Sequence, residues 1–211
     1  MSENMQRLNL KEQQHRLRED VILQAVNTLL AEKGYDLMTV DEVAAMVGIA
    51  KASLYKHFES KEALAAAAMV RLLDRTLEII DAQPESATPL DKLKSIVRWA
   101  LREHLQGEMP SLPSTRSTLR DALVKHSGYI ERLIEVSERL GRWIEAAQEE
   151  GALAELPPEV VLYTMFARAC DPVCDYLKLS GNYSDDEIVE LITTTCFAGL
   201  AARSANAAGR P

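Results

Sequence analysis

One short stretch of the sequence, residues 51–57, brings together side chains that donate hydrogen bonds. If the stretch is helical, Leu54 and Phe58 lie one turn apart and point inward. The outer side and its borders then carry two ammonium groups, a phenol, a hydroxyl, an imidazole and one small methyl group. Such donors suit phosphate oxygens and the acceptor edges of bases in the major groove of DNA. The candidate binding residues are Lys51, Ala52, Ser53, Tyr55, Lys56 and His57.

The charge around these residues differs from that of the whole chain. The 211 residues carry 24 basic and 32 acidic side chains, a net charge of −8, which argues against a protein that coats nucleic acid without regard to sequence. Yet no Asp or Glu occurs from Val43 to Phe58. We therefore expect any DNA-binding surface in the first third of the chain. The alternative is an ordinary helical hairpin, over residues 39–58, with a solvated basic face.

Capping and turn residues predict the helices that position this stretch. Thr39 and Glu42 form a capping-box pattern at the start of a short helix, which ends before Gly48. A second short helix follows this tight turn. The preceding helix is expected to stop at Gly34, and Ser60 is a candidate N-cap for the helix that comes next.

Helical spacing of apolar residues continues along the rest of the chain, and Pro and Gly separate the segments. We find no alternating run typical of strands. The sequence predicts an all-α protein of about nine helices, with a kink at Pro172. The predicted helices cover residues 16–33, 40–47, 50–58, 61–82, 90–106, 114–126, 128–150, 158–180 and 184–204.

These motifs carry a family resemblance. Residues 16–64 resemble the DNA-binding domain of the TetR family of bacterial transcriptional regulators. The resemblance implies an N-terminal three-helix helix-turn-helix domain followed by a C-terminal helical ligand-binding and dimerisation domain. The matching pieces are Gly34-Tyr35, Thr39-Val40, Val43-Ala44, Gly48-Ile49, the run from Lys51 to Phe58, and Ser60-Lys61-Glu62-Ala63-Leu64.

The resemblance also implies a role for each candidate residue in DNA binding. Thr39 would bond a phosphate from the start of the second helix, and Lys61 would clamp one from the start of the fourth. The implied base contacts come from Lys51, Ala52 and Ser53, the backbone contacts from Tyr55 and His57, and a contact of either kind from Lys56. Many family members carry Ser where Ala50 stands, so the recognition helix here lacks a side-chain N-cap. Many carry Gly where Ala52 stands, so one extra methyl group faces the groove.

The expected organisation is two domains. Residues 1–62 form the DNA-binding domain with a flexible arm over 1–12, residues 63–205 form the ligand-binding and dimerisation domain, and 206–211 are a tail. Because a helix-turn-helix monomer reads only a short half-site, we expect a homodimer on a palindromic operator. The last two helices are apolar around their circumference, which favours an interface, or else two core helices of a monomer. The predicted interface residues are Val161, Met165, Val173, Leu177, Ile188, Ile192, Cys196 and Leu200.

The C-terminal helices are also expected to enclose a small apolar or amphipathic effector of unknown identity. Polar and aromatic residues at odds with simple packing are the candidates, and for each of them a purely structural role is the alternative. We expect a repressor that the effector releases from its operator by a population shift. The candidate ligand residues are Trp99, His104, Met109, Arg116, Arg120, Tyr129, Trp143, Phe166 and Cys170.

Other classes of protein are disfavoured. The sequence lacks the common hydrolase, metalloprotease and nucleotide-binding motifs, so we expect no enzyme. An active site around His104 or His126 is one alternative, and a ligand-binding scaffold without DNA binding is another. We expect no cofactor and no metal, and we interpret Cys170, Cys174 and Cys196 as small buried side chains rather than a redox or metal site. No run is apolar enough to span a membrane and no secretory signal is present, so the expected location is the bacterial cytoplasm.

Overall fold

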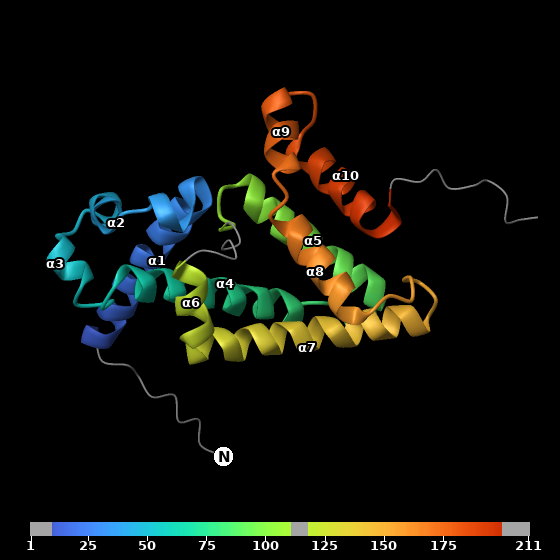
Figure 1. Cartoon of the computed structure of the whole chain (residues 1–211), viewed down its shortest axis with the longest axis horizontal. Helices are drawn as coiled ribbons and strands as arrows, with labels where there is room; N and C mark the ends of the chain where they lie inside the picture. Colours follow the sequence, from blue (N-terminus) through green and yellow to red (C-terminus); the bar gives the residue numbers. More distant parts are fainter. Residues whose placement is uncertain (1–9, 111–117, 200–211) are drawn as a thin grey trace, which may run out of the picture. The chain divides into compact units, whose positions relative to one another are not determined.

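The structure is a computed structural model that describes residues 10–110 and 118–199 (Figure 1). Within these ranges it contains helices and no strand, which confirms the all-α prediction. The predicted helix over residues 158–180 is divided in two, so the described residues form ten helices. They are α1 (Leu10–Leu37), α2 (Val40–Val47), α3 (Lys51–Leu54), α4 (Lys61–Asp81), α5 (Pro89–Leu105), α6 (Thr118–Lys125), α7 (Ser127–Glu149), α8 (Pro158–Ala169), α9 (Val173–Ser180) and α10 (Asp185–Ala198).

The division between α8 and α9 lies at the predicted Pro172 kink. Pro172 has no N–H to continue the ladder of α8, and it becomes the N-cap residue of α9. The carboxylate of Asp171 accepts a hydrogen bond from the Val173 backbone N–H at 3.0 Å and another from the Arg168 guanidinium. These bonds give a partner to a backbone N–H that the start of α9 would otherwise leave free, so the chain changes direction at little cost in hydrogen bonds.

Two compact units make up the chain. The first contains the described residues up to Asp81 together with residues 106–136. In this unit α1 packs on α2 and α4, and α4 packs on α6. The amphipathic pattern of these helices places their apolar stripes in one core. Its largest fully buried members include Ile22, Val26, Met38, Val43, Leu54 and Leu64.

The second unit contains residues 82–105 and the described residues from 137 onward. Here α5 packs against α8, α9 and α10, and α10 also packs against α8 and α9. Leu93 and Leu101 of α5 and Ile188 of α10 are fully buried in it. Helix α7 begins in the first unit and ends in the second. The functional boundary predicted between residues 62 and 63 stays a prediction.

None of the described helices is both long enough and apolar enough to cross a membrane.

Candidate nucleic-acid interface

The sequence around α2 fixes the first half of the helix-turn-helix. The Thr39 hydroxyl accepts a hydrogen bond from the Glu42 backbone N–H at 3.2 Å, and the Glu42 carboxylate accepts one from the Thr39 N–H at 2.9 Å. This is the predicted capping box, and it satisfies two N–H groups that a helix start leaves free. Helix α2 ends at Gly48, whose φ of 74° is the left-handed conformation that glycine adopts at little cost. Val43 and Ala44 face the core.

Helix α3 is shorter than the predicted helix over residues 50–58. Only Lys51–Leu54 are α-helical, and the chain then continues in tight turns in which the Lys56 N–H bonds the Ser53 carbonyl and the His57 N–H bonds that of Leu54. The N-cap residue Ala50 makes no side-chain hydrogen bond, as the sequence predicts. The Phe58 N–H still bonds the Leu54 carbonyl four residues earlier at 3.1 Å, so the turns after α3 keep part of the predicted helical pattern.

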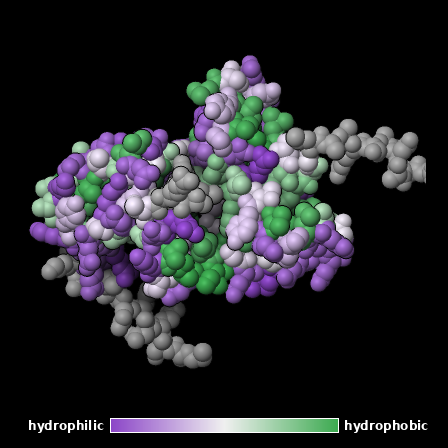
Figure 2. All heavy atoms as spheres, in the orientation of Figure 1, coloured by the Kyte–Doolittle hydropathy of each residue, from purple (hydrophilic) through white to green (hydrophobic). Residues whose placement is uncertain are grey.

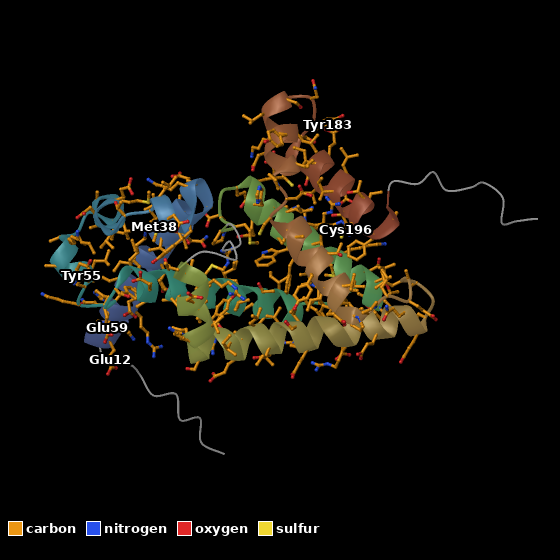
Figure 3. The ribbon with its side chains drawn as sticks, in the orientation of Figure 1. Glu12, Met38, Tyr55, Glu59, Tyr183 and Cys196 are labelled. Atoms are coloured by element: carbon orange, nitrogen blue, oxygen red, sulfur yellow. The ribbon has the colours of Figure 1, made fainter. Side chains whose placement is uncertain are left out.

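The outer face of this segment carries the side chains expected from the sequence. Lys51, Ala52, Tyr55 and Lys56 are exposed, and Ser53 is half-buried at the border. Tyr55 is 44% exposed, and Figure 3 shows it at the outer side of α3. The face is therefore free to meet a groove of DNA, with its short Ala52 side chain among longer donors.

An acidic side chain just before this face holds one of its cations. The Lys51 Nζ lies 2.8 Å from the Asp41 carboxylate, and this hydrogen bond raises the pKa of Lys51. Both side chains are about half-exposed or more, so water and salt screen the pair and it contributes little stability. A DNA phosphate can therefore replace Asp41. Asp41 lies two residues before the acid-free window that begins at Val43, so the sequence pattern did not point to it.

Thr39 is engaged in capping rather than pointing away from the protein. Its hydroxyl donates to the Glu42 carboxylate at 2.8 Å, and Lys33 lies 2.6 Å from the same carboxylate. The Lys33 bond, together with the Thr39 bonds, lowers the pKa of Glu42 to about 2. A phosphate contact at Thr39 therefore means sharing or exchanging this capping bond.

Lys61 lies at the start of α4, as predicted, but its ammonium group is not isolated. It sits 4.2 Å from the centroid of the Tyr35 ring, a cation–π distance. The buried Tyr35 hydroxyl donates to the Glu62 carboxylate at 2.7 Å, and burial, followed by this bond, raises the pKa of Tyr35 to about 12. The Ser60 hydroxyl accepts from the Ala63 N–H at 3.0 Å, the predicted cap of α4. The Lys61 ammonium group is thus held beside the Tyr35 ring in the free protein.

His57 is the candidate that the tertiary structure turns away from the outer face. Its side chain is 9% exposed, and its Nδ1 lies 3.4 Å from the Glu19 carboxylate of α1. Its ring also stacks obliquely on that of His15, with centroids 4.3 Å apart. The predicted backbone contact of His57 with DNA requires this imidazole to leave α1 or to reach past it.

The predicted ligand residues do not gather in one place. Met109, Arg120 and Tyr129 belong to the first unit: Met109 is buried, Arg120 is exposed, and burial raises the pKa of the Tyr129 phenol. Arg116 lies outside the described residues. The second unit holds Trp99, His104, Trp143, Phe166 and Cys170, all half-buried.

His104 and Trp143 of the second unit each contact a charged side chain. The His104 Nε2 lies 3.2 Å from the Asp175 carboxylate, and the Lys92 ammonium group lies 5.7 Å from the centroid of the Trp143 ring. Both contacts join neighbouring parts of the unit, which is the behaviour of packing residues. Their role in binding a ligand stays a prediction.

The second unit also contains two small hollows. One, of about 160 Å³, is lined by apolar residues of α8 and α10, including Met165 and Phe197. The other, of about 230 Å³, is lined by Lys94, Arg98 and Thr193 among others. The Thr193 hydroxyl is buried and finds no hydrogen-bond partner among the described residues. Each hollow is smaller than the roughly 300 Å³ at which small-molecule pockets usually begin.

The cysteines of this unit are poorly placed for thiolate chemistry. Cys174 is fully buried, and this burial raises the pKa of its thiol to about 11. Burial also raises the pKa of Cys196. A thiol that stays protonated near neutral pH is a poor nucleophile and a poor metal ligand.

The residues predicted for a dimer interface divide into two sets. Val161, Met165, Ile188 and Ile192 are at least nine-tenths buried within the chain, so they support their helices from inside. Leu177 and Cys196 are half-buried, Val173 is exposed, and Leu200 lies outside the described residues. Apart from Val173, the residues that point outward from these helices are not the predicted ones. The large exposed side chains of α8, α9 and α10 are Val160, Tyr163, Val173, Tyr176, Leu179 and Leu191.

Comparison with known proteins identifies the first unit. Residues 22–68 match the family described as bacterial regulatory proteins, tetR family. The HTH-type transcriptional regulator TcmR of Streptomyces glaucescens is 26% identical over 138 residues, 63% of this chain and 61% of TcmR. IcaR, the HTH-type negative transcriptional regulator of the biofilm operon icaADBC in Staphylococcus aureus (strain Newman), is 51% identical over 45 residues, 21% of this chain and 24% of IcaR.

Among solved structures, AibR in complex with isovaleryl coenzyme A and operator DNA superposes with a TM-score of 0.59. The match covers 85% of this chain and 98% of AibR at 19% identity, which shows a common fold. The chain spans about 61% of the length of TcmR and 24% of that of IcaR. The family match includes all eight predicted DNA-binding positions, from Thr39 to Lys61. Residues 22–68 of this chain, the part that contains α2 and α3, therefore match the tetR family of bacterial regulatory proteins.

Proposed function

We propose that this protein is a cytoplasmic, homodimeric repressor that binds a palindromic operator through α3 and leaves it when a small amphipathic effector binds. The observation that carries the proposal is the exposed face of α3. Lys51, Tyr55 and Lys56 are exposed donors around Ala52, and a capped α2 and the Gly48 turn hold them in place. We propose no catalytic activity for this protein.

The apolar side chains on the outside of α8, α9 and α10 support a dimer. Tyr163, Tyr176 and Leu179 are each about two-thirds exposed or more. Figure 2 shows apolar surface over α9 and α10. Large apolar groups in water are costly, and a second copy of the chain removes them from it. A two-fold dimer also supplies the second recognition helix that a palindrome requires.

We infer that the effector carries both an acyl chain and an anionic group. AibR, which shares the fold, was crystallised with an acyl thioester of coenzyme A. In this chain the hollow is lined by Lys94 and the unpartnered Thr193 hydroxyl, which suit phosphate or carboxylate oxygens. Arg98 also lines it, but its guanidinium already bonds the Glu190 carboxylate at 2.6 and 2.9 Å, so an anion would have to share or replace Glu190. The hollow is too small for a whole thioester, so binding requires the second unit to open further.

A contact at the end of α5 offers a route between effector and DNA. The segment that follows α5 belongs to the first unit, where the Gln24 and Asn27 side chains of α1 both donate hydrogen bonds to Glu108. Asn27 is 7% exposed, so this bond is shielded from water. Within the first unit this contact ties the segment after α5 to α1, on which α2 packs.

Selection of bound fragments from random DNA, with the full chain and a salt titration, tests the proposal. We expect an enriched palindrome whose affinity falls steeply with salt. Failure to enrich any sequence, with folded and dimeric protein, would contradict DNA recognition by α3. The selected site then serves as a probe for release by acyl-coenzyme A thioesters, with coenzyme A and the free acid as controls.

An Asn27→Ala variant tests the proposed route. We expect it to bind the selected operator within a few-fold of the wild type but to respond more weakly to the releasing thioester. Equal release of both proteins would show that the Glu108 contact does not carry the response.

A further inference from the structure

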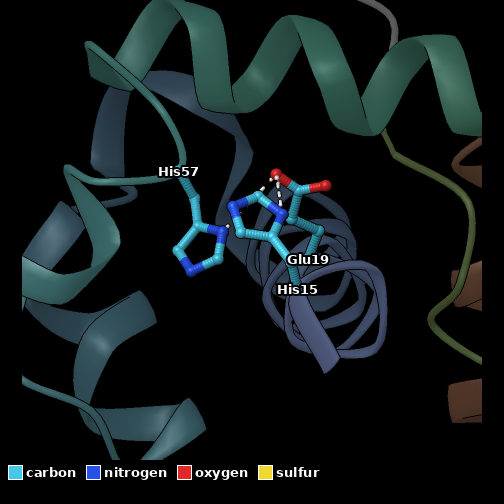
Figure 4. A group of neighbouring side chains, drawn as sticks. All are labelled: His15, Glu19 and His57. Carbon is cyan, nitrogen blue, oxygen red and sulfur yellow. Dashed lines mark hydrogen bonds and ion pairs between the residues drawn. The ribbon is translucent and has the colours of Figure 1, made fainter. Parts of the chain in front are cut away.

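We propose that His15, Glu19 and His57 form a binding site for a divalent transition-metal ion of the Zn²⁺ type. The three side chains meet at the side of the first unit, where the chain leaves α3 (Figure 4). His15 and Glu19 are one turn apart on α1, and His57 reaches them from the turns that follow α3. The proposal needs neither DNA binding nor the effector to be correct.

The ligand set suits such an ion. Two imidazole nitrogens and one carboxylate oxygen are a recurrent Zn²⁺ set, with water in the fourth position. The spacing of four residues on a helix places two ligands on one face, and a third ligand from another element closes the site. His15 is half-exposed, so the open position faces water.

The distances within the cluster fit an ion better than they fit hydrogen bonds. The His15 Nδ1 and the His57 Nδ1 each lie 3.4 Å from the same oxygen, Glu19 Oε1. A nitrogen–oxygen hydrogen bond is typically about 2.9 Å long. In a tetrahedral site with metal–ligand distances of about 2.0–2.1 Å, neighbouring ligand atoms are about 3.3–3.4 Å apart. Two of the three distances between ligand atoms in such a site, those from each imidazole nitrogen to the Glu19 oxygen, are therefore already present.

The third distance, between the His15 and His57 nitrogens, requires only a small movement of the side chains. The three ligand atoms all lie within 4.8 Å of one another, so the two imidazoles must approach by an ångström or so. Their rings are already in contact, with centroids 4.3 Å apart and an angle of 40° between the planes. His15 is exposed enough to adjust its side-chain torsions, whereas His57 is held by its 9% exposed position.

A bound ion would tie the end of α3 to α1. His57 closes the turns after the recognition helix, and its neighbour Phe58 packs on the core of the unit. Binding to the folded form alone stabilises it by mass action. Metal would therefore fix the arrangement in which His57 faces α1.

Zn²⁺ titration of the full-length, untagged protein by calorimetry tests the site. We expect the wild type to bind Zn²⁺, and His15→Ala and Glu19→Gln each to weaken this affinity by at least about tenfold. Loss of a residue that merely orients a metal ligand already weakens metal affinity by about 10–100-fold, so loss of a ligand should cost no less. Thermal melting gives a second readout: Zn²⁺ should raise the Tm of the wild type and not that of either variant. His15→Ala removes an exposed side chain, so its fold should survive, which circular dichroism checks.

His104→Gln is the matched control. It removes an imidazole that faces a single carboxylate, Asp175, without a second imidazole beside it. We expect it to keep the affinity of the wild type. Zn²⁺ affinity and Tm shift that are unchanged in His15→Ala and Glu19→Gln would overturn the proposal and assign any binding to other groups, the three cysteines among them.

Discussion

The α2–α3 segment of the first unit and the α8–α10 segment of the second differ in how their outward faces are made. In α2–α3 the exposed side chains include the donors Lys51, Tyr55 and Lys56, which the sequence predicted, together with the acidic Asp41 and the apolar Met46. In α8–α10 the exposed side chains include Tyr163, Tyr176 and Leu179, none of which was predicted to face outward. A helix with a single apolar stripe has only one way to face the core, whereas a helix that is apolar all round has several.

The two regions also differ in what holds their surfaces. Around α2, ion pairs and caps orient the side chains, as with Lys33 and Glu42. Over α8–α10 large apolar side chains lie exposed among charged and polar ones, and a second copy of the chain is the partner that we propose for them. The side chains of the α2–α3 surface are oriented by contacts within one chain. The apolar side chains of the α8–α10 surface become covered only when two copies associate, as we propose.

The largest expected effect is on the free energy of unfolding, and two leucines allow the comparison. Leu54 in α3 is 1% exposed and Leu179 in α9 is 82% exposed. Leu54→Ala should lower the free energy of unfolding by about 2–5 kcal/mol, because it leaves a cavity in the core of the first unit. Leu179→Ala should change the stability of the monomer by less than about 0.5 kcal/mol. Urea denaturation at low protein concentration measures both, and equal losses would contradict the contrast between the regions.

The next effect concerns association. Leu179→Glu places a charge among the exposed apolar groups of α9, so it should weaken the proposed dimer by at least about tenfold. Sedimentation equilibrium measures the dissociation constant. Val124→Glu, at a position of α6 that is 59% exposed, is the control and should leave it unchanged. If both variants dimerise like the wild type, α9 does not contribute to the interface.

A smaller effect is expected at the DNA face. Lys61→Ala should weaken binding to all sequences alike and reduce the slope of log K against log salt by about one, the contribution of one phosphate contact. Lys92→Ala, beside Trp143 in the second unit, is the matched loss of one cation and should not change the slope. An unchanged slope in Lys61→Ala would remove this residue from the phosphate contacts.

At Ser53 or Lys56 a substitution should act on specificity instead. We expect altered preference at particular positions of the half-site if these side chains make the base contacts predicted for them. Repeating the fragment selection with each variant measures this. Uniform weakening without altered preference would assign the residue to the DNA backbone.

The smallest effect is a dependence on pH at the cap of α2. The pKa of Glu42 is lowered from 4.5 to about 2, chiefly by its bond with Lys33, so its contribution to stability is present above pH 4.5. It should be lost as the pH falls through about 2. The difference in urea midpoint between the wild type and Glu42→Gln should therefore be constant above pH 4.5 and shrink below it. A difference that does not change down to pH 2 would contradict the role of the carboxylate.

Much of the first unit followed from local signals in the sequence. The Thr39–Glu42 capping box, the Gly48 turn and the Ser60 cap each depend on residues a few positions apart, so the chain carries the instruction locally. The division of the helix at Pro172 belongs to the same class, because the missing N–H acts wherever the residue stands.

Tertiary structure decided what depends on distant partners. It turned His57 towards His15 and Glu19, although its place in the sequence borders the outer face of α3. It also buried Ile188 and exposed Leu191 on the same apolar helix, because α5 covers only one side of α10. Local spacing fixes which residues share a helix face, but only the packing of other helices decides which face meets water.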